Sequence, residues 1–193
     1  MLTDNVMTAD AASASIEINT GVKDQITAGG VYAIECRDSN GVLKWREETH
    51  NLVVNVGLQD MNTQYFKGAT YTAAWYIGLI TGPGASVTIA AGDTASSHAG
   101  WSENTTYSNA TRPAATFGTA TTANPSVLSN SASPAQFNIN GTATIAGAFL
   151  ISNSTKSGTT GVLFSASKFT SPGDRAVASG DTLNVTYTFS LAG

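Results

Sequence analysis

The strongest constraint on the fold is a strict alternation of apolar and polar side chains in residues 180–192 (GDTLNVTYTFSLA). The apolar members are every second residue, namely Leu183, Val185, Tyr187, Phe189 and Leu191. A period of two places these side chains on one face of a β-strand and hydroxyls and amides on the other. The segment therefore predicts a strand that packs on a core with one face and presents an uncharged polar surface with the other.

A β-hairpin is predicted near the start of the chain. Residues 31–36 and 42–47 both read as strands, and Asp38-Ser39-Asn40-Gly41 connects them. Asn-Gly between such runs is a strong hairpin signal because both residues tolerate positive φ. Further strands are predicted at residues 73–80, 112–118, 135–139, 142–151, 161–164 and 182–191. Strands at this spacing favour an antiparallel β-sandwich or jelly-roll-like fold.

One short α-helix is expected at residues 55–66. Asn55 is a candidate N-cap, and Gly68 lies where a C-terminal glycine would end the helix. The apolar residues that recur at helical spacing are Val54, Leu58, Met61 and Tyr65. We expect a mainly β chain with an extended N-terminal arm over residues 1–28 and a single β-sandwich domain over residues 29–193.

Charge is scarce and unevenly distributed. Charged residues make up 11% of the chain, against about 25% in typical globular proteins. Residues 1–50 carry four basic and eight acidic side chains, whereas residues 51–193 carry five of each sign. A neutral surface has little repulsion to keep copies apart, which favours homo-oligomerisation or docking onto a larger assembly. The absence of a basic surface disfavours nucleic-acid binding.

The sequence gives no sign of a membrane or redox role. No apolar run approaches the ~20 residues that span a bilayer, and the first residues lack the pattern of a secretory signal. The single cysteine, Cys36, excludes an intrachain disulfide and is expected to be a buried, inert thiol. We expect no cofactor, no metal and no membrane partner, for a protein made in a bacterial cytoplasm.

The predicted N-terminal arm is polar, with a few isolated apolar side chains. Such a segment cannot offset its own ordering entropy by forming a core. Its apolar residues are therefore predicted to contact a neighbouring subunit. The candidate interface residues in the arm are Leu2, Val6, Met7, Ile16 and Ile18.

Residues 81–106 form a long segment rich in Gly, Ala, Ser and Thr, and loops of this length are uncommon unless they make contacts. We expect Asp93 to cap a short helical turn in this segment, with Trp101 packing back. Trp101 and Tyr107 are the aromatic residues with a predicted interface or ligand role. The remaining tryptophans are assigned to the core.

Candidate catalytic residues are few. His98 follows Ser96 and Ser97, with Asp93 and Glu103 nearby, which could in principle supply a nucleophile with its base or a metal site. Sequence neighbours rarely have the geometry of a triad, whose members come from separate elements. Carboxylates for glycoside cleavage would come from Asp60, Asp93, Glu103, Asp174 and Asp181, several of which read as turn residues. A cell-wall hydrolase is therefore the least favoured function.

Several ordered segments resemble a group of tailed-bacteriophage virion structural proteins. They are residues 50–66 (HNLVVNVGLQDMNTQYF), 74–80 (AWYIGLI), 91–94 (AGDT), 98–101 (HAGW), 107–113 (YSNATRP), 146–150 (AGAFL) and the GDTLNVTYTFSL ending. The resemblance runs from about residue 30 to the end of the chain. It implies a virion component, often encoded near the capsid genes, and it assigns no catalytic residue.

These observations predict a non-enzymatic capsid decoration (cement) protein that binds the outer shell of a phage and stabilises it. Its expected partners are the major capsid protein and neighbouring copies of itself, and its expected location is the virion. The alternative is a tail or head fibre, a receptor-binding module that recognises host glycans through Trp101, Tyr107 and the hydroxyl-rich loops.

Overall fold

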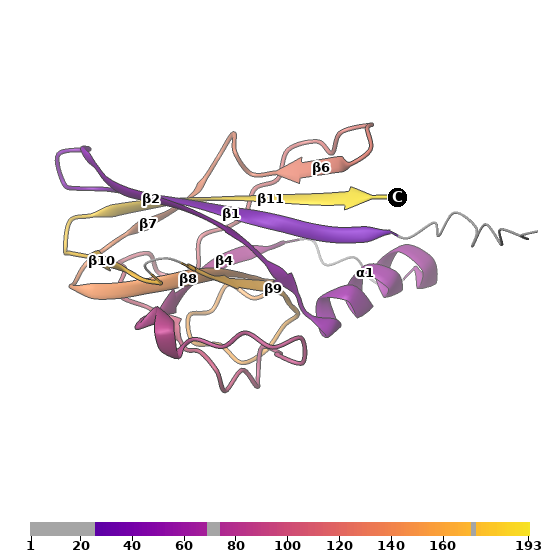
Figure 1. The fold of residues 1–193 in the computed structure, drawn as a ribbon, viewed down its shortest axis with the longest axis horizontal. Coiled ribbons are helices and arrows are strands. Elements are labelled where there is room, and N and C mark those ends of the chain that lie inside the picture. Colours follow the sequence, from indigo (N-terminus) through magenta and orange to yellow (C-terminus); the bar gives the residue numbers. More distant parts are fainter. Residues whose placement is uncertain (1–25, 69–73, 171–172) are drawn as a thin grey trace, which may run out of the picture.

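The computed structural model describes residues 26–68, 74–170 and 173–193. They form two antiparallel β-sheets packed as a sandwich, with α-helix α1 (Asn55–Lys67) at one end (Figure 1). The predicted mainly β sandwich with one short helix is confirmed. Most of the predicted N-terminal arm, residues 1–25, lies outside the described residues. Thr27 and Ala28 already belong to the first strand, so the sandwich begins two residues earlier than predicted.

The first sheet is built around two long strands. Its order is β2 (Leu43–His50), β1 (Thr27–Arg37) and β11 (Thr182–Ala192), and both β6 (Ser126–Ser129) and β7 (Ala135–Asn138) pair with the far side of β11. β1 and β11 are paired over their whole length, from Thr27 with Ala192 to Arg37 with Thr182. The alternation in β11 buries Leu183, Val185 and Tyr187 completely, as predicted.

The second sheet has the order β3 (Leu52–Val53), β9 (Leu163–Lys168), β8 (Ala143–Ile151), β4 (Tyr76–Thr81) and β5 (Glu103–Asn104), and β10 (Arg175–Val177) also pairs with β8. The strands β3, β5, β6 and β10 are short, and none was predicted. The predicted strand at residues 112–118 is wrong. Pro113 has no N–H to donate to a neighbouring strand. Two backbone hydrogen bonds join the segment to the start of β4 and the residue before it: Ile77 N–H donates to Pro113 O, and Ala115 N–H donates to Trp75 O.

The hairpin between β1 and β2 is confirmed, but its turn differs from the prediction. Asp38 Oδ1 accepts hydrogen bonds from the backbone N–H groups of Asn40 (2.8 Å) and Val42 (2.9 Å). Gly41 has φ +80°, whereas Asn40 does not have positive φ. The Asp38 side chain therefore organises the loop, and a single glycine is enough to turn the chain.

Two separate cores lie on the two faces of the second sheet. The first, between the sheets, includes Tyr32, Ile34 and Phe137. The second, on the outer face, includes Phe149, Val87 and Trp101 and is covered by the long segment after β4, which contains the 3₁₀ turn η1 (Gly84–Ser86) (Figure 1). The long segment therefore buries its large apolar side chains inside the molecule. The predicted capped helical turn at Asp93 is wrong, because no helix follows Asp93 there.

One side of the sandwich is closed by contacts from β2 to the opposite sheet. Glu47 forms an ion pair with Arg175, the Trp45 indole N–H donates to Ala176 O (3.1 Å), and Thr49 Oγ1 donates to Lys168 O (2.7 Å). These bonds hold the free edge strand of the first sheet against β9 and β10. In the described residues, no helix is both long enough and apolar enough to cross a membrane.

Near the hairpin, a buried carboxylate makes folding stability depend on pH. Burial alone would raise the pKa of Asp181, but hydrogen bonds from Lys44 Nζ (2.5 Å) and Ala178 N–H (2.8 Å) hold that pKa below its ordinary value. A depressed folded-state pKa gives stability that is present above about pH 4 and is lost as the pH falls through the folded value.

Replacing Lys44 by methionine is therefore expected to cost about 1 kcal/mol at pH 7, a modest loss because the Lys44 side chain is partly exposed. The difference from the wild type should shrink at acidic pH, below the ordinary aspartate pKa of about 4, as Asp181 becomes protonated. Urea denaturation at both pH values measures this. A difference that stays constant or grows on acidification would contradict the assignment.

Candidate functional site

The helix α1 presents a group of apolar side chains to solvent. Leu58, Asn62, Tyr65 and Phe66 are all exposed, and their spacing places them on one helix face. The face toward the sandwich contains Gly57, Met61 and Gln64. We call the three exposed apolar residues Leu58, Tyr65 and Phe66 the α1 stripe. An ordinary surface helix has the opposite orientation, with its apolar side on the core.

Tyr65 and Phe66 are the most exposed members of the α1 stripe, with 83% and 76% of their surface accessible. Their rings meet edge to face at a centroid distance of 4.9 Å. Exposed aromatic clusters of this kind are enriched at protein–protein interfaces. The pattern of the apolar residues predicted the helix but did not predict which face is buried.

The position of Gly57 explains this orientation. A Cβ atom at Gly57 would lie 2.4 Å from the carbonyl oxygen of Phe164, so the backbones of α1 and β9 are in direct contact here. The N-cap residue of the helix is Val54, and no side chain forms a capping hydrogen bond there. The predicted capping by Asn55 is therefore wrong. Asn55 instead donates its backbone N–H to Ala91 O (2.8 Å). The predicted end at Gly68 is confirmed by its left-handed φ of 60°.

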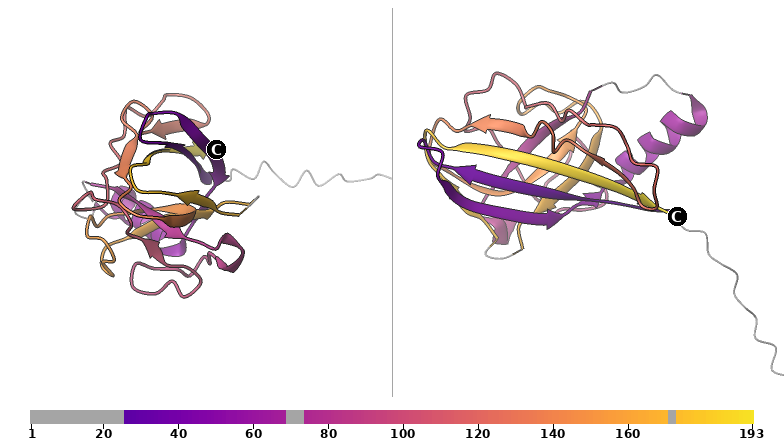
Figure 2. Two further views of the ribbon diagram at one scale, coloured as in Figure 1. Left: turned by 90° about the vertical axis from the view of Figure 1, so that its left-hand side faces the viewer. Right: turned by 90° about the horizontal axis from the view of Figure 1, so that it is seen from above.

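The α1 stripe lies at the end of the molecule where the chain enters and leaves the sandwich. β1 begins and β11 ends at this end, beside α1 (Figure 2). Ile26, the residue before β1, is a further exposed apolar side chain here. We call this region, which comprises Ile26, α1 and Gly193, the α1 end. Val42 and Leu43 are exposed at the hairpin, at the opposite end of β1.

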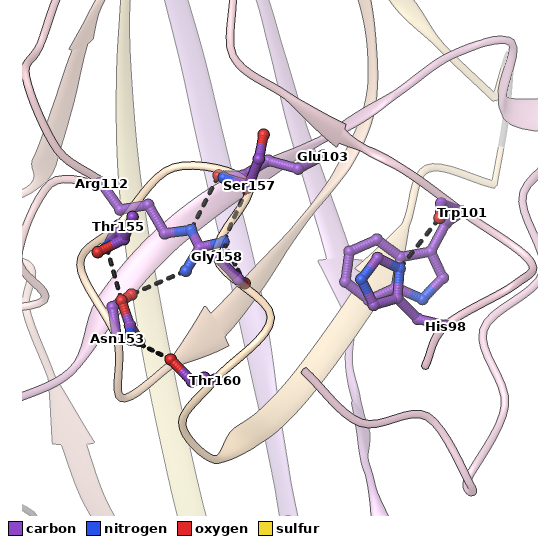
Figure 3. Close-up of polar contacts among 9 residues, drawn as sticks. All are labelled: His98, Trp101, Glu103, Arg112, Asn153, Thr155, Ser157, Gly158 and Thr160. Carbon is purple, nitrogen blue, oxygen red and sulfur yellow. Dashed lines mark hydrogen bonds and ion pairs between the residues drawn. The ribbon is translucent and has the colours of Figure 1, made fainter. Parts of the chain in front are cut away.

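A second candidate site is a cleft on the outer side of the second sheet, which we call the His98 cleft (Figure 3). Its volume is about 250 Å³. Aromatic and aliphatic side chains form part of its lining, and hydroxyls and one ion pair form the rest. The lining residues are Ala95, His98, Trp101, Ser102, Glu103, Arg112, Phe149, Ile151, Ser157, Gly158, Thr159 and Leu163.

Glu103 and Arg112 form a bidentate ion pair in this cleft. Arg112 Nε donates to Glu103 Oε1 (2.9 Å) and Nη2 donates to Oε2 (2.8 Å). The side chains are only 6% and 2% exposed, so the pair is desolvated. Glu103 Oε2 also accepts the backbone N–H of Ser157 (2.6 Å). Both oxygens of the Glu103 carboxylate are therefore engaged in structural bonds, which argues against its use as a catalytic acid.

The same ion pair fixes the loop that follows β8. Arg112 donates to the carbonyls of Asn153 (2.9 Å) and Gly158 (3.4 Å). The Asn153 side chain accepts from Thr155 N–H (2.7 Å) and donates to Thr160 Oγ1 (2.8 Å) (Figure 3). Ser157 has φ 55°, a left-handed conformation that is uncommon for a residue with a Cβ. These bonds hold residues 153–160 in one conformation beside the cleft.

The geometry does not form the nucleophile and base suggested by the sequence. His98 Nδ1 hydrogen-bonds to the carbonyl of Trp101 (3.1 Å), and its ring stacks on the Trp101 ring at 3.9 Å (Figure 3). Asp93 Oδ2 instead accepts from the Trp101 indole (2.8 Å) and from Ala90 N–H (3.1 Å). Among the described residues, no hydrogen bond joins His98 to Asp93 or to a serine.

Two of the three remaining candidate carboxylates, Asp60 and Asp181, have structural roles. Asp181 holds Lys44 and the turn before β11, and Asp60 is bonded to Gln64 within α1. In the ranges that the structure covers, no three His, Cys, Asp or Glu side chains are close enough to hold a metal ion. Burial raises the pKa of the Cys36 thiol to about 12, which fits the inert thiol predicted for it.

The predicted interface residues have two different outcomes. Leu2, Val6, Met7, Ile16 and Ile18 lie outside the described residues, so their role stays a prediction. Trp101 and Tyr107 are 7% and 1% exposed, and both are covered by other parts of the chain. The interface or ligand role of these two rings stays a prediction, and neither ring is available as an exposed platform.

Comparisons with models of protein families, with curated proteins and with solved structures found no match. The resemblance to phage virion proteins therefore stays a prediction from the sequence.

Proposed function

We propose that this chain is a non-enzymatic structural protein of a phage virion, a capsid decoration protein that docks on the outer shell through its α1 end. The observation that carries the proposal is the α1 stripe, in which Tyr65 and Phe66 are exposed side by side. Burying one such side chain contributes roughly 1.5–3 kcal/mol, so the pair supplies a strong anchor for a protein partner.

Two further observations support an assembling role. Three ion pairs near the His98 cleft and the hairpin, Arg112–Glu103, Lys44–Asp181 and Arg175–Glu47, have structural roles, which leaves little that points to catalysis. Residues 51–193 have no net charge, which lowers the electrostatic and desolvation cost of bringing surfaces together. Many equivalent copies on one shell would add their individual contact energies against the pressure of packaged DNA.

The fibre alternative has less support than the decoration role. It relied on Trp101, Tyr107 and the hydroxyl-rich loops, and neither ring is exposed for stacking on a surface glycan. The α1 stripe instead suits a protein partner, because its exposed groups are a phenol, a phenyl ring and an aliphatic side chain on one rigid helix.

The double variant Tyr65→Ser/Phe66→Ser tests this proposal. Both side chains are exposed, so we expect an unchanged circular dichroism spectrum and melting temperature. Losing about 3 kcal/mol of buried apolar surface should weaken binding to phage shells that lack the protein by about 100-fold. Co-sedimentation with such shells measures this.

The matched control is Val42→Ser/Leu43→Ser, which removes two exposed apolar side chains at the opposite end of β1. It should bind as the wild type does. If the α1 variant also binds with wild-type affinity, the α1 end is not the docking surface.

A further inference from the structure

The His98 cleft combines properties that point to one class of ligand. Its only strongly charged groups in the lining, Glu103 and Arg112, neutralise each other within 2.9 Å. The Arg112 guanidinium is already paired with Glu103, so it offers little attraction to a phosphate or carboxylate ligand. A cation would likewise find the carboxylate already paired. The lining therefore favours a ligand without net charge.

The cleft also offers an aromatic surface of the kind that packs on an apolar ring face. Trp101 covers one face of the His98 ring at 3.9 Å, and His98 is itself only partly buried. Trp101 is held in turn by the hydrogen bond to Asp93 and by contact with Phe149 at a centroid distance of 5.0 Å. The His98 ring is thus supported from behind by a rigid stack, a preorganised arrangement for a ligand that lies against it.

Polar groups are placed around this surface without protein partners. Among the described residues, the hydroxyls of Ser102, Ser157 and Thr159 line the cleft and form no hydrogen bond with another protein group. Arg112 has five N–H groups, and its bonds to Glu103, Asn153 and Gly158 use four of them. One N–H on the buried guanidinium therefore has no acceptor among the described residues.

The left-handed Ser157 supports the same conclusion. A strained backbone conformation persists only where its surroundings hold it, and such residues cluster at ligand sites. Here the Ser157 N–H is bound by Glu103 Oε2, so a buried ion pair maintains the conformation of the loop that carries the hydroxyls. In a chain with so few charges, this ion pair serves to preform one wall of the cleft.

We propose that the His98 cleft binds one neutral sugar ring. The apolar C–H face of the ring would lie on His98, and its hydroxyls would exchange hydrogen bonds with the Ser157 and Thr159 hydroxyls. The volume of about 250 Å³ lies near the lower limit of the roughly 300–1,000 Å³ typical of small-molecule pockets, which limits the ligand to about one sugar residue. This inference is independent of the docking surface on α1.

The test is a titration of the full-length ¹⁵N-labelled protein, followed through its tryptophan indole N–H signals. The chain has three tryptophans, and Trp101→Phe assigns the signal of Trp101. The probes are N-acetyl-D-glucosamine, D-glucose and D-galactose, with glycerol as a small polyol control. We expect a saturable shift of the Trp101 signal for at least one sugar, with a Kd of about 1–10 mM, and none for glycerol.

Variants locate the site. His98→Ala should weaken sugar binding about tenfold by removing the stacked ring. Thr159→Val, on an exposed loop where folding is not at risk, should weaken it about threefold. The control is His50→Ala, which removes the other of the two histidines of the chain and should leave the Kd unchanged.

The proposal is overturned if none of the three sugars gives a saturable shift at about 100 mM, or if His98→Ala and Thr159→Val both bind as the wild type does. The Tyr65→Ser/Phe66→Ser variant should retain sugar binding, and His98→Ala should still sediment with phage shells. Failure of one proposal is thereby distinguished from failure of the other.

Discussion

Replacing Arg112 by methionine is expected to lower the free energy of unfolding by about 3–5 kcal/mol, because it leaves the Glu103 carboxylate buried without its counter-ion. Both side chains are almost fully covered, so water cannot take the place of the guanidinium. The variant also removes the bonds to Asn153 O and Gly158 O that hold the loop after β8. Chemical denaturation followed by circular dichroism measures the loss.

The double variant Arg112→Met/Glu103→Leu is the informative control. It removes both charges and replaces them by apolar groups, so no unpaired carboxylate remains in the cleft. We expect it to be more stable than Arg112→Met alone, because a buried ion pair is often replaceable by apolar side chains at small cost. If Arg112→Met lowers the free energy of unfolding by less than about 1 kcal/mol, the ion pair does not stabilise the fold as we infer.

Replacing Gly57 by alanine should destabilise the protein by at least about 2 kcal/mol, although helix propensity alone would predict the opposite. Alanine is favoured over glycine inside a helix by about 1 kcal/mol. The added Cβ, however, would lie 2.4 Å from Phe164 O and 3.0 Å from the Phe164 carbonyl carbon and Cα. These are backbone atoms of β9, which cannot move without disturbing the sheet, so the steric cost exceeds the propensity gain.

Asn62→Ala supplies the matched control, because Asn62 lies on the exposed face of the same helix. It should be neutral or slightly stabilising, since only propensity changes. Thermal denaturation of both variants distinguishes the two effects. A Gly57→Ala protein as stable as Asn62→Ala would show that α1 does not contact β9 as closely as described.

The two long strands of the first sheet were predictable because period-two patterning alone determines which side chains are buried. In β11, Leu183, Val185 and Tyr187 could only face a core. The short strands were not predictable in this way. β10 has three residues and β5 has two, too few for a period to be visible, and both exist because β8 and β4 offer them a paired edge.

The orientation of α1 could not be predicted for a related reason. Val54, Leu58, Met61 and Tyr65 fit helical spacing, yet only Val54 and Met61 pack inward. The rotation of the helix is fixed by the contact between Gly57 and Phe164, which are distant in sequence. The adjacent Tyr65-Phe66 pair just before Gly68 was the available signal that one aromatic side chain at least would face outward.

The Arg112–Glu103 pair was equally hidden. The two residues are nine positions apart, Glu103 in the two-residue strand β5 and Arg112 in a segment without regular structure, and their role depends on a loop that follows β8. The scarcity of charge was the one sequence signal that these two residues have a specific role, because residues 51–193 contain ten charged side chains in all. Several of the few charged side chains in this chain form ion pairs within the fold, and Lys44 with Asp181 and Glu47 with Arg175 are further examples.

The most direct test of the decoration role is the number of copies of this protein in purified phage particles, measured by quantitative mass spectrometry against the major capsid protein. We predict a fixed ratio that corresponds to equivalent sites over the whole shell, and we predict that it drops to background for the Tyr65→Ser/Phe66→Ser variant. A handful of copies at one vertex, or none in the particle, would contradict the account.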